Sequence, residues 1–151
     1  MMLPTFHELK PSQCDALLGR NHVGRIAYTF HDRVGIEPIG YVYEPNRIYI
    51  RTASGSKFST LTHHPWVAFE VDEVAGPFDW QSVIVRGTAH VLSPDGNTSD
   101  RRSYERALAL LRRAVPGTLG EGDPVPFRTI IVMIAIDEIT GRVASTRESV
   151  L

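Results

Sequence analysis

The sequence predicts a mainly β protein whose antiparallel strands form a meander or a small barrel. Apolar and polar residues alternate with a period of two in several segments, which is the pattern of half-buried strands. Short polar turns, and not regular crossover helices, separate most of these segments, which favours antiparallel neighbours over a doubly wound parallel sheet. The 151 residues are most simply one domain, residues 1–151, and they are enough to bury a core without disulfides.

The composition is that of an ordinary globular protein, with 42% hydrophobic and 22% charged residues. The formal net charge is −1, so the chain lacks the excess of basic residues that is typical of nucleic-acid-binding proteins. We therefore expect no nucleic-acid partner. The single cysteine, Cys14, excludes an internal disulfide and suits a reducing cytoplasm. No signal-like N-terminus and no run of about 18 apolar residues occur, so we expect a cytoplasmic location and no membrane partner. The histidines show no ligand spacing, and no metal site is expected.

The first third of the chain predicts a helix followed by a hairpin. The helix is expected over Leu9–Arg20, where apolar residues recur at helical spacing. Val23–Phe30 and Val34–Tyr43 alternate and are joined by a polar turn, so they are expected to pair. Pro38 lies inside the second strand. Because proline cannot donate a ladder hydrogen bond, it marks an edge, a bulge or a place where something other than a strand, such as a flat ligand, lies alongside.

The stretch Arg47–Lys57 contains a predicted strand, a small polar turn and the start of a helix. Its apolar and polar residues alternate up to Arg51, which predicts a half-buried strand. Lys57 follows six residues later, at the beginning of a helix expected over Ser56–His64. Cations beside a helix N-terminus suit a phosphate group. We therefore expect this stretch to hold the phosphate of a bound cofactor.

The rest of the chain predicts two strands, a helix, a loop and a last strand: Trp66–Asp72, Trp80–Leu92, Asp100–Val115, Pro116–Phe127 and Arg128–Ile139. Gly87, in the middle of the second of these strands, indicates a bend or the close approach of another backbone. The loop is rich in proline and glycine and is expected to be mobile. The unbroken apolar run of the last strand predicts burial on both faces, and Gly141 is expected to begin a tail. The pattern thus predicts six strands and about three helices.

An ordered series of short segments carries a resemblance to a known family. In chain order the segments are Val23–Ala27, Pro38–Ile39, Ile48–Thr52 with Gly55–Lys57, Pro65–Phe69 and Trp80–Ala89. The series resembles the pyridoxamine 5′-phosphate oxidase-like family. It is most similar to the short flavin-nucleotide-binding branch that includes nitroimidazole-reductase-like proteins. The resemblance covers residues 9–92 and, more loosely, Ile130–Arg142.

The resemblance implies a six-stranded antiparallel split β-barrel with Greek-key-like connections and peripheral helices. It also implies a homodimer that holds one flavin mononucleotide (FMN) in each of two clefts at the subunit interface. The residues that it places at the cofactor belong to the second strand, the phosphate turn and the start of the long strand: Glu37, Pro38, Ile39, Arg51, Thr52, Ser56, Lys57, Trp80, Gln81 and Ser82. Glu37 to Ile39 match positions near the isoalloxazine ring, and Ser82 matches a position that faces the flavin.

The expected function is that of a flavin-dependent oxidoreductase acting on an unknown small substrate. A flavin carries the redox chemistry itself, which fits a sequence in which no catalytic residue can be assigned. Two alternatives keep the fold: a non-catalytic module that binds flavin or haem, and a deazaflavin-dependent reductase whose basic channel Arg86, Arg128 and Arg142 would line. The segment from Arg147 onward does not match the substrate-binding arginine and histidine of the full-length oxidase, so vitamin B6 oxidation is not expected. Substrate choice is expected from the second strand, the loop before Trp80 and the loop after the last helix.

Overall fold

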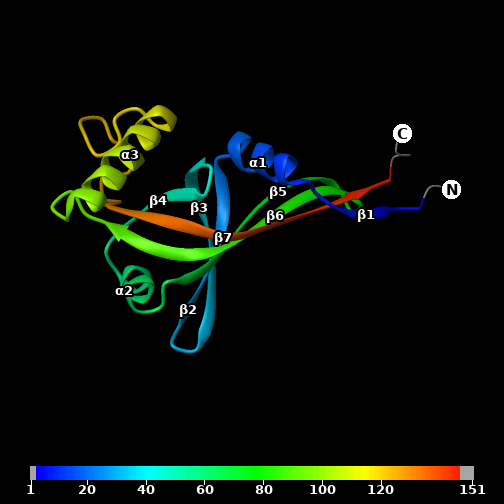
Figure 1. The fold of residues 1–151 in the computed structure, drawn as a ribbon, viewed down its shortest axis with the longest axis horizontal. Coiled ribbons are helices and arrows are strands. Elements are labelled where there is room, and N and C mark those ends of the chain that lie inside the picture. Colours follow the sequence, from blue (N-terminus) through cyan, green and yellow to red (C-terminus); the bar gives the residue numbers. More distant parts are fainter. Residues whose placement is uncertain (1–2, 147–151) are drawn as a thin grey trace.

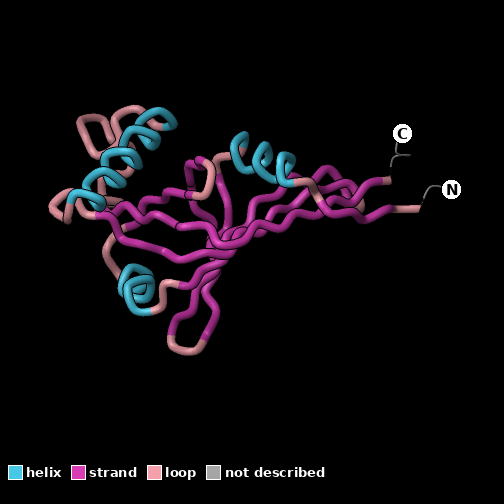
Figure 2. Tube along the Cα trace, viewed as in Figure 1, coloured by secondary structure: helices cyan, strands magenta, loops and turns pink. Residues whose placement is uncertain are grey.

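The computed structural model describes residues 3–146, apart from the side chains of residues 56–59. Within these residues the chain forms seven strands and three helices: β1 (Thr5–Glu8), α1 (Pro11–Arg20), β2 (Val23–Phe30), β3 (Arg33–Glu44), β4 (Arg47–Thr52), α2 (Ser56–His63), β5 (Trp66–Gly76), β6 (Asp79–Leu92), α3 (Thr98–Ala114) and β7 (Ile130–Ser145). The strands form the centre of the molecule and the helices lie around them (Figure 1, Figure 2). None of these described helices is long and apolar enough to span a lipid bilayer.

Six of the strands close into a ring, as a barrel requires. The order around the ring is β7-β4-β3-β2-β5-β6, and β6 returns to β7. Every pairing in the ring is antiparallel. β1 lies outside the ring, where it pairs with the C-terminal end of β7. The predicted mainly β class and the six-stranded split barrel are thus confirmed.

Two strands differ from the prediction at the ends of the chain. The sequence predicts no strand before Leu9, but Thr5–Glu8 pairs with β7. All four residues of β1 are exposed, so no alternating pattern marks the segment. The predicted end of the last strand at Ile139 was also wrong, because β7 continues to Ser145. Pairing with β6 on one side and β1 on the other keeps Gly141 inside the strand and out of a tail.

The barrel is split where β3 and β4 diverge. β3 pairs with β2 along Arg33–Gly40, which confirms the predicted hairpin, but it pairs with β4 only from Tyr41 onward. β4 then continues alongside Ile130–Ala135 of β7. The other side of Arg33–Gly40 therefore has no strand partner among the described residues. Figure 1 shows the β2–β3 hairpin projecting away from the rest of the sheet.

Two apolar cores hold the fold together, and β4 contributes to both. Ile48 and Ile50 face the barrel interior, where neither has any exposed surface. Tyr49 lies on the other face of β4, fully buried in a second core that includes Leu111 of α3. β4 is therefore buried on both faces and is not the half-buried strand that its alternation predicts. The difference arises because α3 and the loop over residues 116–127 cover its outer face.

Gly87 lies where another backbone approaches closely, as its position in the sequence predicts. A Cβ atom on Gly87 would lie 2.2 Å from the carbonyl oxygen of Ala135 on β7. The register of the two strands shifts at the same level, since Arg86 pairs with Glu138 and Gly87 pairs with Ile136. The extra residue on β7 makes a bulge, which increases the local twist and helps the sheet to close.

Candidate functional site

The open edge of β3 carries the first group of predicted cofactor residues. Strand alternation places Glu37 and Ile39 on the inner face and Pro38 on the outer face. Ile39 is 5% exposed and belongs to the barrel core, whereas Glu37 is half-buried and Pro38 is exposed. Of these three residues, Ile39 thus has a structural role in packing, and Pro38 is the most accessible from outside.

The ladder between β2 and β3 explains why a proline is tolerated at residue 38. The backbone N–H of Tyr41 donates to the carbonyl oxygen of His22 at 3.0 Å. Since the hydrogen-bonding groups of a strand alternate in direction, the backbone nitrogen of Pro38 points away from β2, toward the open edge. Its missing N–H therefore removes no bond from the ladder. The edge beside it is free to accept a ligand in place of a strand.

Arg51, at the end of β4, holds the loop that follows α3. Its guanidinium makes a bidentate pair with Asp123, with contacts of 3.1 and 2.6 Å, and it also donates to the carbonyl oxygens of Val125 and Arg128. These bonds use four of the five N–H groups of a guanidinium. The hydrogen bonds from Arg51 hold the pKa of the Asp123 carboxyl well below its ordinary value, with help from backbone N–H groups of Val125 and Leu119. Phosphate binding by Arg51 stays a prediction.

The helix α2 begins a few residues after the end of β4, so its first backbone N–H groups follow that strand closely. The helix begins after Gly55, which adopts φ 158° and ψ −165°, a conformation open only to glycine. Glycine has no side chain to cap the first turn, so the first N–H groups of the helix can serve an anion. Thr52 is 6% exposed and ends the preceding strand. The side chains of Ser56 and Lys57 lie outside the described residues, and their roles stay predictions.

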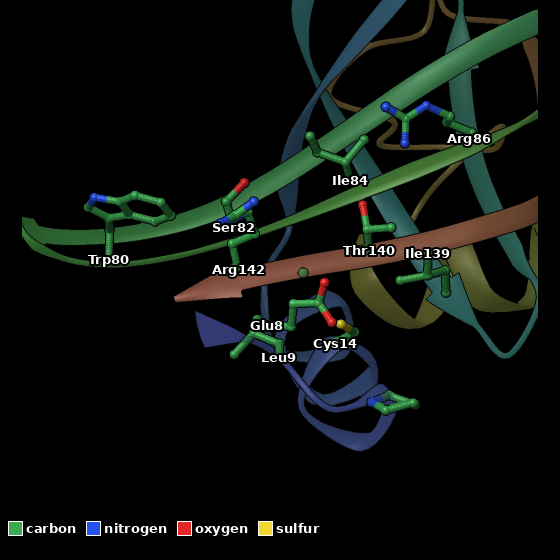
Figure 3. A pocket seen from close by; sticks show the side chains of 12 residues that line it. Glu8, Leu9, Cys14, Trp80, Ser82, Ile84, Arg86, Ile139, Thr140 and Arg142 are labelled. Atoms are coloured by element: carbon green, nitrogen blue, oxygen red, sulfur yellow. The ribbon is translucent and has the colours of Figure 1, made fainter. Parts of the chain in front are cut away.

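Trp80 and Ser82, from the second group of predicted residues, lie at a cavity of about 670 Å³ on the outer side of β6 and β7. Figure 3 shows the side chains around it: Trp80, Ser82, Ile84 and Arg86 on β6, Thr140 and Arg142 on β7, and Glu8, Leu9 and Cys14 from β1 to α1. The ring of Trp80 packs against Phe6 with centroids 6.4 Å apart. A cavity of this size with apolar walls and a few charged groups is typical of a small-molecule or cofactor site.

A polar network joins Ser82 to the open edge of β3. The hydroxyl of Ser82 donates to the carboxylate of Glu70 at 2.8 Å, which leaves its oxygen as an acceptor toward a ligand. Arg25 Nη1 lies 3.5 Å from a carboxylate oxygen of Glu70 and also of Asp72. Burial, together with the neighbouring Asp72 carboxyl, raises the pKa of Glu70. Arg25 in turn pairs with Pro38 across the ladder, so Pro38 and Ser82 share one outer sheet face.

The structure separates some residues that the sequence groups together. Gln81 lies on the opposite face of β6 from Ser82 and does not line the cavity. Of the three arginines expected to form one basic channel, Arg86 and Arg142 line the cavity, but Arg128 lies beneath α3. Within residues 3–146, and leaving aside the undescribed side chains, no three histidine, cysteine, aspartate or glutamate residues gather as metal ligands.

Several residues of the cavity were missed by the sequence interpretation. They come from β1, α1 and the extension of β7: Glu8, Leu9, Pro11, Cys14, Ile139, Thr140 and Gly141. The close packing of α1 on β7 explains one of them, since a Cβ atom on Gly141 would lie 2.6 Å from Cys14 Sγ. The only local signal for this wall is a glycine and an arginine after a long apolar run, a pattern that predicts a tail.

A comparison with models of known protein families shows which family the chain belongs to. A family model described as pyridoxamine 5′-phosphate oxidase matches residues 10–143. The chain belongs to this family. The match spans both groups of site residues and the ring of strands. No curated protein matches the sequence significantly.

Solved structures of family relatives show the same fold. A FAD-binding protein from Mesorhizobium loti superimposes with a TM-score of 0.72 and 24% identity, over 93% of this chain and 98% of the other. A FAD-binding protein from Mycobacterium smegmatis gives a TM-score of 0.65 and 28% identity, over 91% and 98%. A Bacteroides thetaiotaomicron protein proposed to confer 5-nitroimidazole antibiotic resistance gives 0.71 and 14%, over 94% and 89%. The family that the sequence resembles is confirmed, and the branch within it stays a prediction.

Proposed function

We propose that the protein is a cytoplasmic flavin-dependent oxidoreductase that binds FMN and acts on a small molecule. The observation that carries this proposal is the meeting of an unpaired strand edge, the end of β4 and an uncapped helix start where the barrel splits. A planar ring can lie along the edge beside Pro38, and a phosphate can accept bonds from the first N–H groups of α2. These are the parts that an FMN needs, and they fit the chain's family.

Each group of the site would do a distinct part of the work. The backbone donors of α2 and the Lys57 ammonium would hold the phosphate. Thr52, the last residue of β4, would contact the same end of the cofactor. The hydroxyl of Ser82 donates its hydrogen bond to Glu70, so its oxygen would accept a hydrogen bond from a ligand N–H. The bound flavin supplies electron and hydride transfer, so the chain needs only to bind and orient the reactants.

We also propose that a second copy of the chain covers the outer face of β2, β3 and β5. Three large apolar side chains stand exposed there: Val34 at 77%, Ile36 at 69% and Trp66 at 70%. Charged residues such as Arg25 and Glu70 border them. An apolar patch with a polar border is typical of a protein interface. A homodimer formed through this face would place the open edge of β3 at the subunit boundary, where a cofactor could contact both copies.

FAD is the second candidate cofactor, because structural relatives from two organisms are named as FAD-binding proteins. Purified protein should show absorbance maxima near ~450 and ~370 nm if it retains an oxidised flavin, and near ~400 nm if it retains haem. Titration of the cofactor-free protein with FMN, FAD and riboflavin would then rank the three. A colourless protein that binds none of the flavins would reject the proposal.

The phosphate anchor can be tested with Lys57→Ala. We expect FMN to bind about ten-fold more weakly, because a charge-assisted bond to phosphate is lost, while riboflavin, which lacks the phosphate, binds unchanged. Arg102→Ala, on the exposed surface of α3, is the matched control and should change neither affinity. Equal losses for FMN and riboflavin would place the phosphate elsewhere. Arg51 is a poor choice for this test, since it also holds Asp123.

A further inference from the structure

We infer that a groove beneath α3 is a second small-molecule site, which takes a monoanionic ligand with an apolar body. The groove has a volume of about 400 Å³ and lies between the end of β3, the C-terminal turn of α3 and the following loop. It shares no lining residue with the cavity beside Trp80. Pro38, Thr52 and α2, where the flavin is proposed, do not line it either. The inference therefore does not depend on flavin binding.

The walls of the groove are apolar and come from three different elements. Val42 projects from β3, Leu111 from α3, and Val115 and Val125 from the chain after α3. Leu111 is 7% exposed and gives the groove a packed floor, whereas Val115 at 42% exposed stands at its rim. A hydrocarbon chain or ring laid along these side chains would remove apolar surface from water on both partners.

The charge at the end of the groove selects an anion. Arg51 and Asp123 neutralise each other across 2.6 Å. Arg128 also lines the groove and is half-buried, with its guanidinium 5.9 Å from the ring centroid of Phe127. Through its side chain it makes no hydrogen bond or ion pair with any described residue. One positive charge thus remains uncompensated beside apolar walls, and a carboxylate is the group that a guanidinium fork recognises best.

The groove is formed before any ligand arrives. Arg51 donates to the carbonyl oxygens of Val125 at 3.3 Å and of Arg128 at 3.0 Å, which fixes the loop to β4. Thr118 is 1% exposed, and its hydroxyl donates to the carbonyl oxygen of Val115 at 2.6 Å, which fixes the loop to α3. A ligand therefore has little chain to order when it binds, and this ordering is a principal cost of binding at loops.

Octanoate is a suitable probe, with octylammonium as its charge-reversed counterpart. Calorimetric titration of the full chain should give a dissociation constant on the order of 1 mM or tighter for octanoate, and at least about ten-fold weaker binding of octylammonium. Arg128→Gln should weaken octanoate about ten-fold by removing the charge. The control is Arg113→Gln. Arg113 is exposed in the last turn of α3 and does not line the groove, so its replacement should leave the affinity for octanoate unchanged.

Two further measurements locate the probe. Ala114→Trp would fill the groove from an exposed helix position and should abolish octanoate binding without disturbing the fold. Saturating FMN should leave the octanoate affinity unchanged. Equal binding of the two probes, an Arg128→Gln variant with unchanged affinity, or competition between octanoate and FMN would each overturn the inference. Because octanoate binding is measured directly, the result is independent of whether FMN binds.

Discussion

Arg51 illustrates how a residue with a plausible ligand role can be committed to the fold. Its alternation and its position before a polar turn point to a phosphate, but its side chain lies beneath the loop over residues 116–127 and is 8% exposed. Asp123, the partner that occupies it, is 72 positions away in the chain and sits in a loop without any strand or helix pattern. No local signal could have found this pair. The loop is expected to be mobile, but Arg51, Arg112 and Thr118 all hold it with hydrogen bonds.

Asp123→Asn tests this pair at the level of one atom. Leu119 N–H and Val125 N–H donate to different carboxylate oxygens of Asp123, so the amide loses one of these two acceptors as well as the charge. We therefore expect the thermal midpoint at pH 7 to fall by several degrees. The isosteric Glu121→Gln, at an exposed position of the same loop, should have no effect. Digestion with a protease should also cut the loop faster in the Asp123 variant than in the control.

The pH dependence of the same variant separates the contribution of the charge from that of the lost acceptor, because only the charge titrates. Because the folded-state pKa of Asp123 is lowered, the stability that it contributes is present above the ordinary aspartate pKa of about 4 and is lost as the pH falls below it. The gap between the midpoints of the parent chain and Asp123→Asn should therefore narrow steadily as the pH is lowered from about 4 to about 2. A gap that stays constant over this range would show that the ion pair contributes no stability.

Among the secondary-structure elements, β6 and β7 approach each other so closely at Gly87 that no side chain fits between them. Gly87→Ala would force its new methyl group against the Ala135 carbonyl and should lower the free energy of unfolding by roughly 1–3 kcal/mol. Gly19→Ala is the matched control, because a Cβ atom at Gly19 in α1 meets nothing within 4 Å and should stabilise the helix by about 0.5 kcal/mol. Urea denaturation of both variants measures the difference, and equal effects would exclude the contact.

The elements that the sequence predicts well are those whose pattern is local. The hairpin of β2 and β3, the helix α3 and the turn after β4 follow from alternation, helical spacing and a glycine. β1 could not be predicted, since its four exposed residues become a strand only through pairing with β7. For the same reason the cavity wall formed by Glu8, Cys14 and Thr140 was not foreseen. By contrast, Pro38 and Gly87 were interpreted correctly, because each breaks a pattern in a way that has a definite backbone cause.

At the scale of the whole molecule, the apolar patch on the outer face of β2, β3 and β5 leads us to expect a homodimer. Ile36→Glu places a charge in the middle of the apolar patch and should convert a homodimer to a monomer, with the loss of flavin from the same preparation. Phe127→Glu, at a residue 63% exposed on the far loop, controls for a lower surface hydrophobicity and should stay dimeric. Sedimentation velocity of both variants gives the answer, and a monomeric parent chain would contradict the dimer proposal.

β7 is the partner of three strands, and this decides when the fold can form. It pairs with β1, β4 and β6, and its far end meets residues 140 positions earlier in the chain. During synthesis the barrel stays open until β7 has left the ribosome, because no other described strand can close the ring. Contacts this distant in sequence form slowly, and the apolar faces of β4 and β6 remain uncovered meanwhile. The nascent chain therefore passes most of its synthesis as an incomplete sheet that must be kept apart from its neighbours.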